Sequence, residues 1–190
     1  MSLYNYVKSN HTPSTWSSLD TPSEGYRLCS LDSYDLEFMR VASKVRLTLP
    51  VVVTEVERVE NPFLWGCYEL KKAEYRARGI PFSEMELFHC TARTYIPSIV
   101  KNNLDWRRAN RVKFGMGVSF SPSAKYANTQ ANMNIGISRA TILAKVIVGR
   151  CCSGSSTMSI PIEPYDTSTG NVGSVYVKYY DNEFYPLYVA

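Results

Sequence analysis

The sequence has 190 residues, which is enough for one domain with a sizeable core and too few for two. Hydrophobic residues make up 45% and charged residues 20%, and these proportions exclude a disordered chain. The net charge of +4 is too small to indicate a nucleic-acid-binding protein by itself, and no apolar run has the length that spans a membrane.

The first predicted elements are an irregular lead-in and a helix. Residues 1–15 are polar without periodicity, so we expect a flexible N-terminal tail before a single domain over residues 16–190. Residues 16–35 are rich in Ser, Asp, Pro and Gly and indicate irregular structure. Four apolar residues then recur at the spacing of one helical face, namely Phe38, Val41, Ala42 and Val45. We expect Ser33 or Asp32 to cap this helix.

A strand and a second helix are expected next. Residues 51–56 are rich in β-branched side chains and follow Pro50, which ends the first helix, so they predict a strand. Asn61 followed by Pro62 is typical of a helix start, because it combines an N-cap residue with proline in the first turn. We expect this helix to end at Gly79. Its predicted buried face consists of Leu64, Cys67, Tyr68 and Tyr75.

The second half of the chain is predicted to consist mostly of strands. We expect a short strand over residues 85–89, a short helix over residues 95–102 and the strongest strand over residues 141–148. Residues 174–180 and 185–189 predict a final hairpin. Helices therefore come early and strands late, which favours the α+β class. The phosphate-binding motifs GxGxxG and GxxxxGK[ST] are both absent from the sequence.

Cysteines, histidines and a basic cluster are the remaining residues with distinctive chemistry. The five cysteines include no CxxC pair and the only histidines are His11 and His89, so we expect no metal site. The chain begins without an apolar signal core, which indicates an intracellular protein with reduced thiols, in the nucleus, the cytoplasm or both. The basic residues between Arg93 and Lys113 either face a phosphate or pyrophosphate group or form a solvated surface.

Three segments in sequence order carry a resemblance to a known family. They read Leu-Phe-His-Cys-Thr at residues 87–91, Gly-Met-Gly-Val-Ser-Phe at residues 115–120, and Ser-Val-Tyr-Val at residues 174–177 with Tyr-Pro-Leu-Tyr-Val at residues 185–189. Together these segments resemble the catalytic domain of the poly(ADP-ribose) polymerases. Residues 61–65 and 103–107 are similar to the mono-ADP-ribosylating branch that includes the zinc-finger antiviral proteins.

The resemblance implies both a fold and a substrate. The implied fold is the split antiparallel β-sheet of the ADP-ribosyltransferases, like that of diphtheria toxin, with flanking helices. In this fold NAD is a co-substrate, held in a cleft that has no Rossmann glycine loop, and no metal takes part. The family reaction transfers ADP-ribose to a side chain, and the nicotinamide–ribose bond breaks through an oxocarbenium-like transition state.

The resemblance also implies a site of three positions, usually His, Tyr and Glu in the family. Here these positions are His89, Ser119 and Val175. His89 is expected to donate a hydrogen bond to a ribose hydroxyl of the adenosine half. Ser119 cannot supply the aromatic face of a tyrosine. Val175 lacks the carboxylate that binds the ribose and permits chain elongation, so no polymer synthesis is expected.

Further positions complete the implied cleft. Cys90 replaces a glycine whose backbone clamps the nicotinamide amide, and this role survives if φ stays negative and the sulfur does not fill the slot. Ala127 and Gln130 stand where a serine and a second stacking tyrosine are expected, and Tyr126 is near enough to compensate for a missing ring. No catalytic residue is assigned. The predicted NAD-binding residues are His89, Cys90, Ser119 and Tyr126.

Three functions remain open from the sequence. The first is a mono-ADP-ribosyltransferase with NAD as donor and protein side chains as acceptors, and without polymer synthesis. The second is an inactive pseudoenzyme of the same fold, an interaction module for RNA-associated or other protein partners. It is suggested by the joint departure of four positions, Ser119, Ala127, Gln130 and Val175. The third, a nucleic-acid binder that uses the basic cluster, has no RRM, KH or zinc-knuckle motif in its support. No membrane partner is expected.

Overall fold

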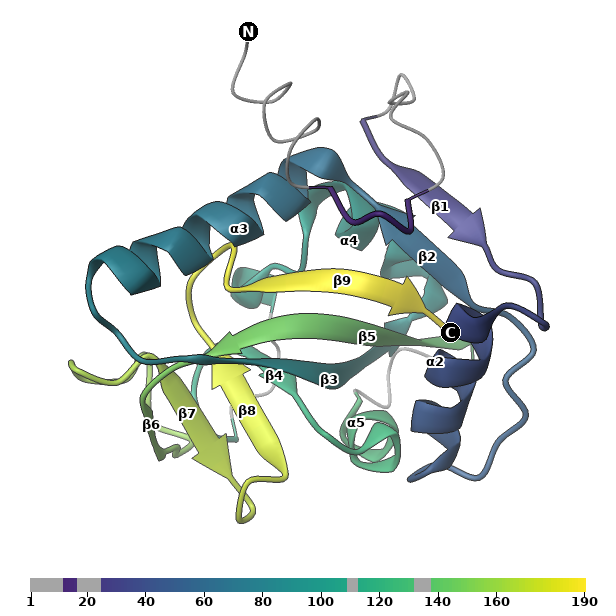
Figure 1. Cartoon of the computed structure of the whole chain (residues 1–190). Coiled ribbons are helices and arrows are strands. Elements are labelled where there is room, and N and C mark those ends of the chain that lie inside the picture. The colour runs from purple at the N-terminus through teal and green to yellow at the C-terminus, as the bar shows by residue number, and fades with distance from the viewer. Residues whose placement is uncertain (1–11, 17–24, 109–112, 132–137) are drawn as a thin grey trace, which may run out of the picture.

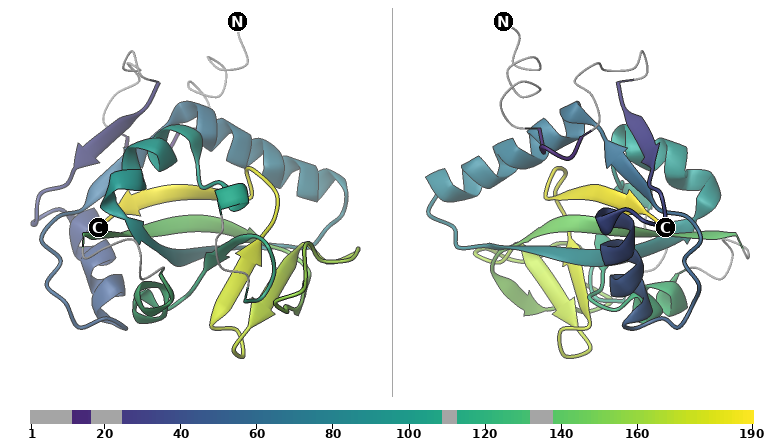
Figure 2. Two further views of the ribbon diagram at one scale, coloured as in Figure 1. Left: turned by 180° about the vertical axis from the view of Figure 1, so that it is seen from behind. Right: turned by 45° about the vertical axis from the view of Figure 1, so that its right-hand side comes forward.

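Two β-sheets lie next to each other in the computed structural model, and helices pack against the larger sheet (Figures 1 and 2). The structure describes residues 12–16, 25–108, 113–131 and 138–190. The predicted α+β class with a split sheet is confirmed. Most of the predicted tail, residues 1–11, lies outside the described residues. Within the described part, no helix is long and apolar enough to cross a membrane.

The larger sheet has five strands in the order β1-β2-β9-β5-β3, and every neighbouring pair is antiparallel. The strands are β1 (Arg27–Ser30), β2 (Glu57–Glu60), β3 (Ser83–Ala92), β5 (Arg139–Val148) and β9 (Phe184–Val189). The β3–β5 pair is long, with Ser83 opposite Val148 at one end and Ala92 opposite Arg139 at the other. Strand β3 lies at the edge of this sheet and carries the segment Leu-Phe-His-Cys-Thr.

The smaller sheet has four strands in the order β4-β8-β7-β6. The strands are β4 (Val118–Phe120), β6 (Cys151–Ser153), β7 (Thr167–Gly170) and β8 (Val175–Lys178). The pairs are antiparallel except β6–β7, which is parallel. A bridge joins the sheets where β4 ends, because Phe88 N–H donates to the Ser121 carbonyl at 2.7 Å and Ser121 N–H donates to the Phe88 carbonyl at 2.9 Å.

The helices cover both faces of the larger sheet. They are α2 (Leu36–Arg46), α3 (Pro62–Ala77), α4 (Ile96–Asn102) and α5 (Ala124–Gln130), with short 3-10 helices at η1 (Arg93–Tyr95) and η2 (Trp106–Arg108). Helices α3 and α4 pack with Leu87 and Ile142 of the sheet in one apolar cluster. Helices α2 and α5 pack with Phe88 and Leu143 in another. Because successive strand residues point to opposite faces, β3, β5 and β9 each contribute to both clusters.

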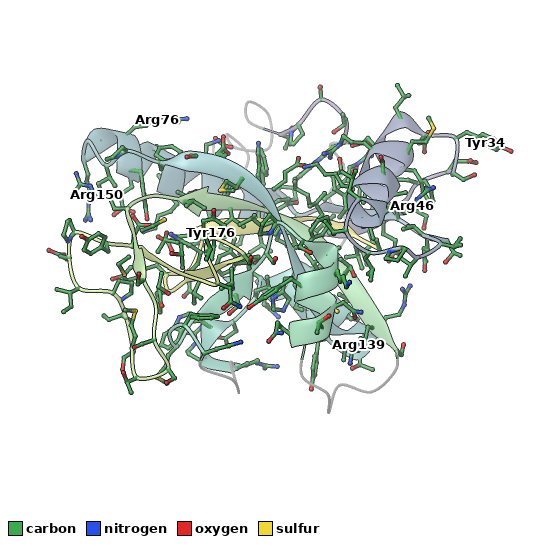
Figure 3. The ribbon with its side chains drawn as sticks, turned by 90° about the horizontal axis from the view of Figure 1, so that it is seen from below. Tyr34, Arg46, Arg76, Arg139, Arg150 and Tyr176 are labelled. Carbon is green, nitrogen blue, oxygen red and sulfur yellow. The ribbon has the colours of Figure 1, made fainter. Side chains whose placement is uncertain are left out.

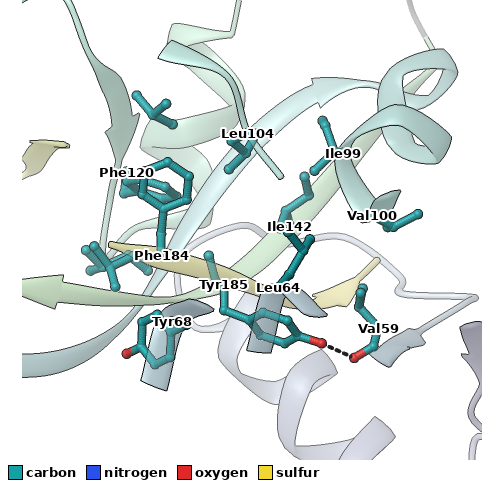
Figure 4. Close-up of a cluster of buried hydrophobic side chains, with 14 of the residues drawn as sticks. Val59, Leu64, Tyr68, Ile99, Val100, Leu104, Phe120, Ile142, Phe184 and Tyr185 are labelled. Carbon is teal, nitrogen blue, oxygen red and sulfur yellow. Dashed lines mark hydrogen bonds between the residues drawn. The ribbon is translucent and has the colours of Figure 1, made fainter. Parts of the chain in front are cut away.

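Tyr185 ties together the cluster beneath α3 (Figure 4). Its ring is fully buried and makes an edge contact with Trp65 at 5.1 Å between centroids. Its hydroxyl donates to the Val59 carbonyl at 2.8 Å and accepts from Asn61 N–H at 3.1 Å. A buried hydroxyl with both a donor and an acceptor partner avoids the loss of free energy that an unpaired one brings. Trp16 stacks on the same ring at 6.5 Å.

The first two helices largely follow the sequence predictions. The buried residues of α2 are the predicted Phe38, Val41, Ala42 and Val45. Its N-cap is Asp35, so the prediction of Ser33 or Asp32 is wrong: the Asp35 carboxylate instead accepts from the N–H of Asp32 at 2.8 Å. Helix α3 begins as predicted, because the Asn61 side chain accepts from Leu64 N–H at 3.0 Å. Its buried face includes Trp65 in place of the partly exposed Cys67.

The strand predicted over residues 51–56 is wrong. This segment forms no strand, and Val52 is 86% exposed. The paired strand follows it as β2, whose polar sequence Glu-Arg-Val-Glu conceals it. Arg58 and Glu60 are buried there because the guanidinium donates to the Glu60 carboxylate at 2.8 Å and 3.0 Å and also bonds to Glu37. Mutual neutralisation lets a charged strand occupy the interior.

Two other predictions about strands need correction. The irregular lead-in contains β1, which pairs with β2 from Arg27 opposite Glu60 to Ser30 opposite Glu57. The final hairpin does not form, because β8 pairs with β4 and β7 whereas β9 pairs with β2 and β5. The two strands are consecutive in sequence but belong to different sheets.

A buried ion cluster lies where the chain passes from β8 to β9. The Lys178 side chain is fully buried, and its Nζ donates to Asp166 Oδ1 and to Thr167 Oγ1, both at 2.8 Å. Glu183, also fully buried, lies 3.4 Å from the same Nζ and accepts from the Tyr75 hydroxyl at 2.5 Å. Burial raises the pKa of Glu183, and the Lys178 ammonium opposes that rise. The cluster connects both sheets and α3.

Replacing Lys178 with Met is expected to lower the free energy of unfolding by about 3–5 kcal/mol, because two carboxylates would then lose their buried cation. Urea denaturation at pH 7 measures this change. Arg78→Met is the control, since Arg78 pairs with Glu74 at 3.3 Å on the surface, where a loss of about 0.5 kcal/mol or less is expected. Equal losses in the two variants would contradict the role given to Lys178.

Candidate functional site

One cleft brings together the positions that the family resemblance singled out. It has a volume of about 1520 Å³ and is lined by residues of both sheets and of α3, α4 and α5. The predicted positions that line it are His89, Cys90, Ser119, Tyr126, Ala127, Gln130 and Val175. The sheet edges explain why these residues lie together. Strand β3 forms the edge of one sheet, and β4 and β8 pair at the edge of the other.

His89 is held by a contact between the two sheets. Its Nδ1 lies 3.0 Å from the Ser119 carbonyl oxygen, and its ring lies 5.9 Å from that of Phe120. A carbonyl only accepts, so Nδ1 carries the proton. Burial lowers the pKa of His89, which keeps the ring neutral near pH 7, with the Nε2 lone pair available. In this tautomer Nε2 is an acceptor, whereas the sequence analysis expects His89 to donate to a ribose hydroxyl, so the direction of that bond stays a prediction.

Cys90 meets the first condition that the sequence analysis set for it, because its φ is not positive. It lies in a regular β-strand opposite Thr141, and it is not among the residues with positive φ. Its Sγ lies 3.6 Å from Asn128 Oδ1, so the thiol is directed at α5. Burial raises the pKa of this thiol, against an opposing effect of Arg139, so the residue is a poor nucleophile.

The backbone of Cys90 faces the open edge of β3. Phe88, two residues earlier, uses its N–H and carbonyl to bridge to Ser121 on that edge. In an antiparallel strand, residues two apart direct their backbone groups to the same side. Cys90 therefore presents an N–H donor and a carbonyl acceptor on the edge that lines the cleft. Such a pair matches the acceptor and donor of a primary amide.

The walls of the cleft around this edge are small or polar. Ser119 is exposed on β4, and Ala127 and Gln130 come from α5. None of the three carries a ring, so these positions provide no stacking surface for a planar ligand. An aromatic side chain that the sequence analysis missed, Phe114, also lines the cleft. The signal for it was its place directly before the segment Gly-Met-Gly-Val-Ser-Phe.

Tyr126 is held at one side of the cleft. Its hydroxyl accepts from Asn171 Nδ2 at 2.7 Å, and its ring packs against the apolar cluster that contains Val175. Asn171 begins a turn between β7 and β8 in which three consecutive residues, through Val172 and Gly173, have positive φ. The ring thus lies against a turn of the smaller sheet, a partner that the sequence analysis also missed. Its predicted compensation for a missing stacking ring stays a prediction.

Val175 closes the cleft with an apolar surface. It is 4% exposed and packs with Val177 and Tyr179, opposite Gly170 in the register of β7 and β8. An ionised carboxylate at this position would lie among apolar side chains, which is unfavourable without a partner. The site therefore has no acid at this strand position, as the sequence predicted.

The basic cluster is divided by the fold. Arg107, Arg108 and Lys113 line the cleft, and Arg107 Nε donates to Asp105 Oδ1 at 2.6 Å. Arg93 instead pairs with Glu55 at 2.6 Å. The cluster is thus not one continuous basic surface in the described residues, and Arg111 lies outside them. Those residues also contain no group of His, Cys, Asp or Glu that could hold a metal ion.

Comparison with known proteins agrees with this geometry. The family described as "Poly(ADP-ribose) polymerase catalytic domain" matches residues 36–175, well over half of the chain. The chain is 28% identical over 191 residues to human "Protein mono-ADP-ribosyltransferase PARP12", and 29% identical over 193 residues to human "Protein mono-ADP-ribosyltransferase PARP14". Both matches cover 93% of this chain, but 27% and 11% of those relatives.

A third relative belongs to the branch that the sequence segments indicated. Mouse "Zinc finger CCCH-type antiviral protein 1" is 27% identical over 99 residues, covering 50% of this chain and 10% of that protein. The chain therefore spans only about a quarter or less of the length of these relatives. The family match, the split sheet and the cleft with His89 at its edge agree, and the chain belongs to the poly(ADP-ribose) polymerase catalytic domain family.

Proposed function

We propose that this chain transfers single ADP-ribose units from NAD to side chains of a protein acceptor. The observation that carries the proposal is the meeting of His89, the open edge at Cys90 and the apolar Val175 in one cleft. The first two provide places to hold NAD, and the third limits the reaction to one unit. The mono-ADP-ribosyltransferase names of the human relatives support the same reaction.

The residues present fit the two ends of NAD. A ribose hydroxyl donates well to the free Nε2 of a neutral His89, whose ring is already oriented by the Ser119 carbonyl. The nicotinamide amide fits the N–H and carbonyl of Cys90. The Cys90 thiol is directed at Asn128 of α5. Arg107, Arg108 and Lys113 place positive charge along the same cleft, which suits a pyrophosphate. NAD brings the bond that breaks, between nicotinamide and ribose.

Binding of NAD is expected to be weak. The backbone clamp and His89 remain, but Ser119, Ala127 and Gln130 offer no aromatic surface. A stacking ring contributes on the order of 1 kcal/mol beyond its burial, which corresponds to about fivefold in affinity per ring. Transfer is then limited by occupancy of the cleft more than by the loss of a reacting group.

Val175 supports transfer of one unit only. Elongation requires that a ribose hydroxyl of the first unit act as acceptor, and a carboxylate normally polarises that hydroxyl. The side chain of Val175 has no hydrogen-bonding atom, and its neighbours Val177 and Tyr179 are buried with it. Protein side chains that are nucleophilic without such help remain possible acceptors.

The inactive interaction module is the alternative. It rests on the same missing rings, but the relatives named as mono-ADP-ribosyltransferases favour transfer over it. Association with RNA-bound partners is compatible with the zinc-finger antiviral relative. If this chain neither binds NAD nor transfers label, the alternative replaces the proposal.

Incubation of the purified chain with labelled NAD is expected to label the chain itself or added protein with one ADP-ribose unit per modified side chain. Mass spectrometry of peptides and a denaturing gel measure this, because polymer would give a ladder. His89→Ala is expected to lower incorporation by about tenfold, since it removes a buried hydrogen bond to ribose. A ladder of longer products would contradict the role given to Val175.

Ser119→Tyr is expected to increase the affinity for a non-hydrolysable NAD analogue about fivefold, because it adds a ring to an exposed position of the cleft. Isothermal titration calorimetry of the analogue measures the change. Ser83→Tyr is the matched control, on an exposed strand residue outside the cleft lining, and should leave the affinity unchanged. No gain in a folded Ser119→Tyr variant would show that the nicotinamide pocket is blocked.

The pKa of His89 predicts a pH dependence of stability. Burial lowers this pKa below the ordinary 6.5, so the folded state binds a proton at His89 less readily than the unfolded state does. The contribution of His89 to the free energy of unfolding is therefore highest above pH 6.5 and decreases as the pH falls below that value. Unfolding free energies at pH 7.5 and pH 5.5 should therefore differ more in the wild type than in His89→Gln, which cannot titrate. Urea denaturation measures both, and equal differences would show that His89 titrates normally.

A further inference from the structure

Helix α5 forms the wall of the cleft that faces the edge of β3, and it is a single short element. Its Ala127 and Gln130 line the cleft. Seven residues do not form a stable helix alone, so its position depends on its contacts. At its beginning, Ala124 N–H donates to Thr48 Oγ1 at 2.8 Å, and the Ser123 side chain caps the first turn.

The C-terminal part of α5 is held by Arg139, a partly buried residue of β5. Arg139 Nη1 donates to the Asn128 carbonyl at 2.7 Å and to Asn128 Oδ1 at 3.1 Å. The Asn128 carbonyl is one of the last four carbonyls of the helix, and such carbonyls generally find no N–H partner within a helix. A cation is also favourable at that end of the helix dipole. Figure 3 labels Arg139 beside this helix. The contact is therefore a helix C-terminal cap from outside the helix.

Arg139 is itself fixed by the larger sheet. It is the first residue of β5 and pairs with Ala92 at the end of β3. Asn128 Oδ1 also accepts from the Cys90 thiol of β3 at 3.6 Å. One side chain of α5 thus meets both strands of the β3–β5 pair, one through Cys90 and the other through Arg139. Together with the packing of Ala124 and Ala127 in the cluster that contains Phe88, these contacts hold α5 beside the edge of β3.

We propose that Arg139 is a positioning residue for NAD, which acts through Asn128 by holding α5 at the distance from β3 that the nicotinamide end requires. The proposal rests on the proposed function for the role of NAD, and on the structure alone for the position of α5. Because Ser119 and Gln130 carry no ring, the fit of the nicotinamide end depends on the separation of α5 and β3. Arg139 lies outside the cleft lining that the structure describes, so it contributes by position and not by contact.

Arg139→Gln is expected to make the amides of α5 exchange faster and to raise KM for NAD about fivefold, with kcat changed less than twofold. The reacting groups stay in place, so the loss falls on binding of NAD and appears in KM. Hydrogen–deuterium exchange of residues 126–131, measured without NAD, gives the first readout. Transfer kinetics with labelled NAD give the second.

Three variants sharpen the test. Arg139→Lys keeps a cation that can still donate to Asn128, so it should keep most of the protection of α5. Asn128→Ala removes the side-chain acceptor from the helix itself and should also make α5 exchange faster, though by less than Arg139→Gln. It serves as the test of the contact if Arg139→Gln does not fold. Arg150→Gln is the matched control, since it removes the same charge from an exposed residue just beyond the other end of β5 (Figure 3).

The two levels of the proposal fail in different ways. Unchanged exchange of α5 in folded Arg139→Gln and Asn128→Ala would overturn the positioning role. An exchange difference together with an unchanged KM would overturn its connection to NAD. If the wild type binds no NAD while the exchange difference persists, the proposed function fails and the control of α5 by Arg139 stands.

Discussion

The arrangement of the two sheets depends on the buried ion pairs of the Lys178 ammonium group. It lies at the end of β8 with no exposure to solvent, and it meets carboxylates from the segments that precede β7 and β9. Without the cation, Asp166 and Glu183 would bring two negative charges together in the interior. The chain passes from the smaller to the larger sheet over a few residues, and there the Lys178 ammonium neutralises the charge of the neighbouring carboxylates.

The cleft follows from that crossing. One sheet contributes His89 and Cys90 at its edge, and the other contributes Ser119 and Val175. The Phe88–Ser121 bridge and the His89–Ser119 contact hold the two edges together at the site. A site built between two sheets is sensitive to their separation, so contacts far from the ligand affect its shape. The tie between α5 and the β3–β5 pair is of this kind.

The parts of the site that remain differ in origin from those that are missing. The N–H and carbonyl of Cys90 on the open edge of β3 are backbone groups, which any residue supplies if the strand edge stays open. The orientation of His89 depends on a carbonyl of Ser119, which is also backbone. The stacking rings and the carboxylate are side chains, and single substitutions remove them. Under the proposed function, the chain therefore offers NAD backbone contacts that it keeps, and it lacks the side-chain contacts that single substitutions remove.

The sequence by itself determined the apolar face of α2, the capped start of α3 and several residues that line the cleft. Phe38 to Val45 and the Asn61–Pro62 start are local patterns, because helix periodicity and capping act over a few residues. Only the tertiary structure decided the strands. The polar β2 is buried because Arg58 pairs with Glu37 and Glu60, and Lys178 and Glu183 are buried together where the chain passes from β8 to β9. Likewise, Tyr126 contacts Asn171, which lies 45 residues later in the sequence, and Arg139 of β5 contacts Asn128 of α5. Pairing and ion contacts between distant segments leave no periodic signal, because their free energy appears only when the chain is folded.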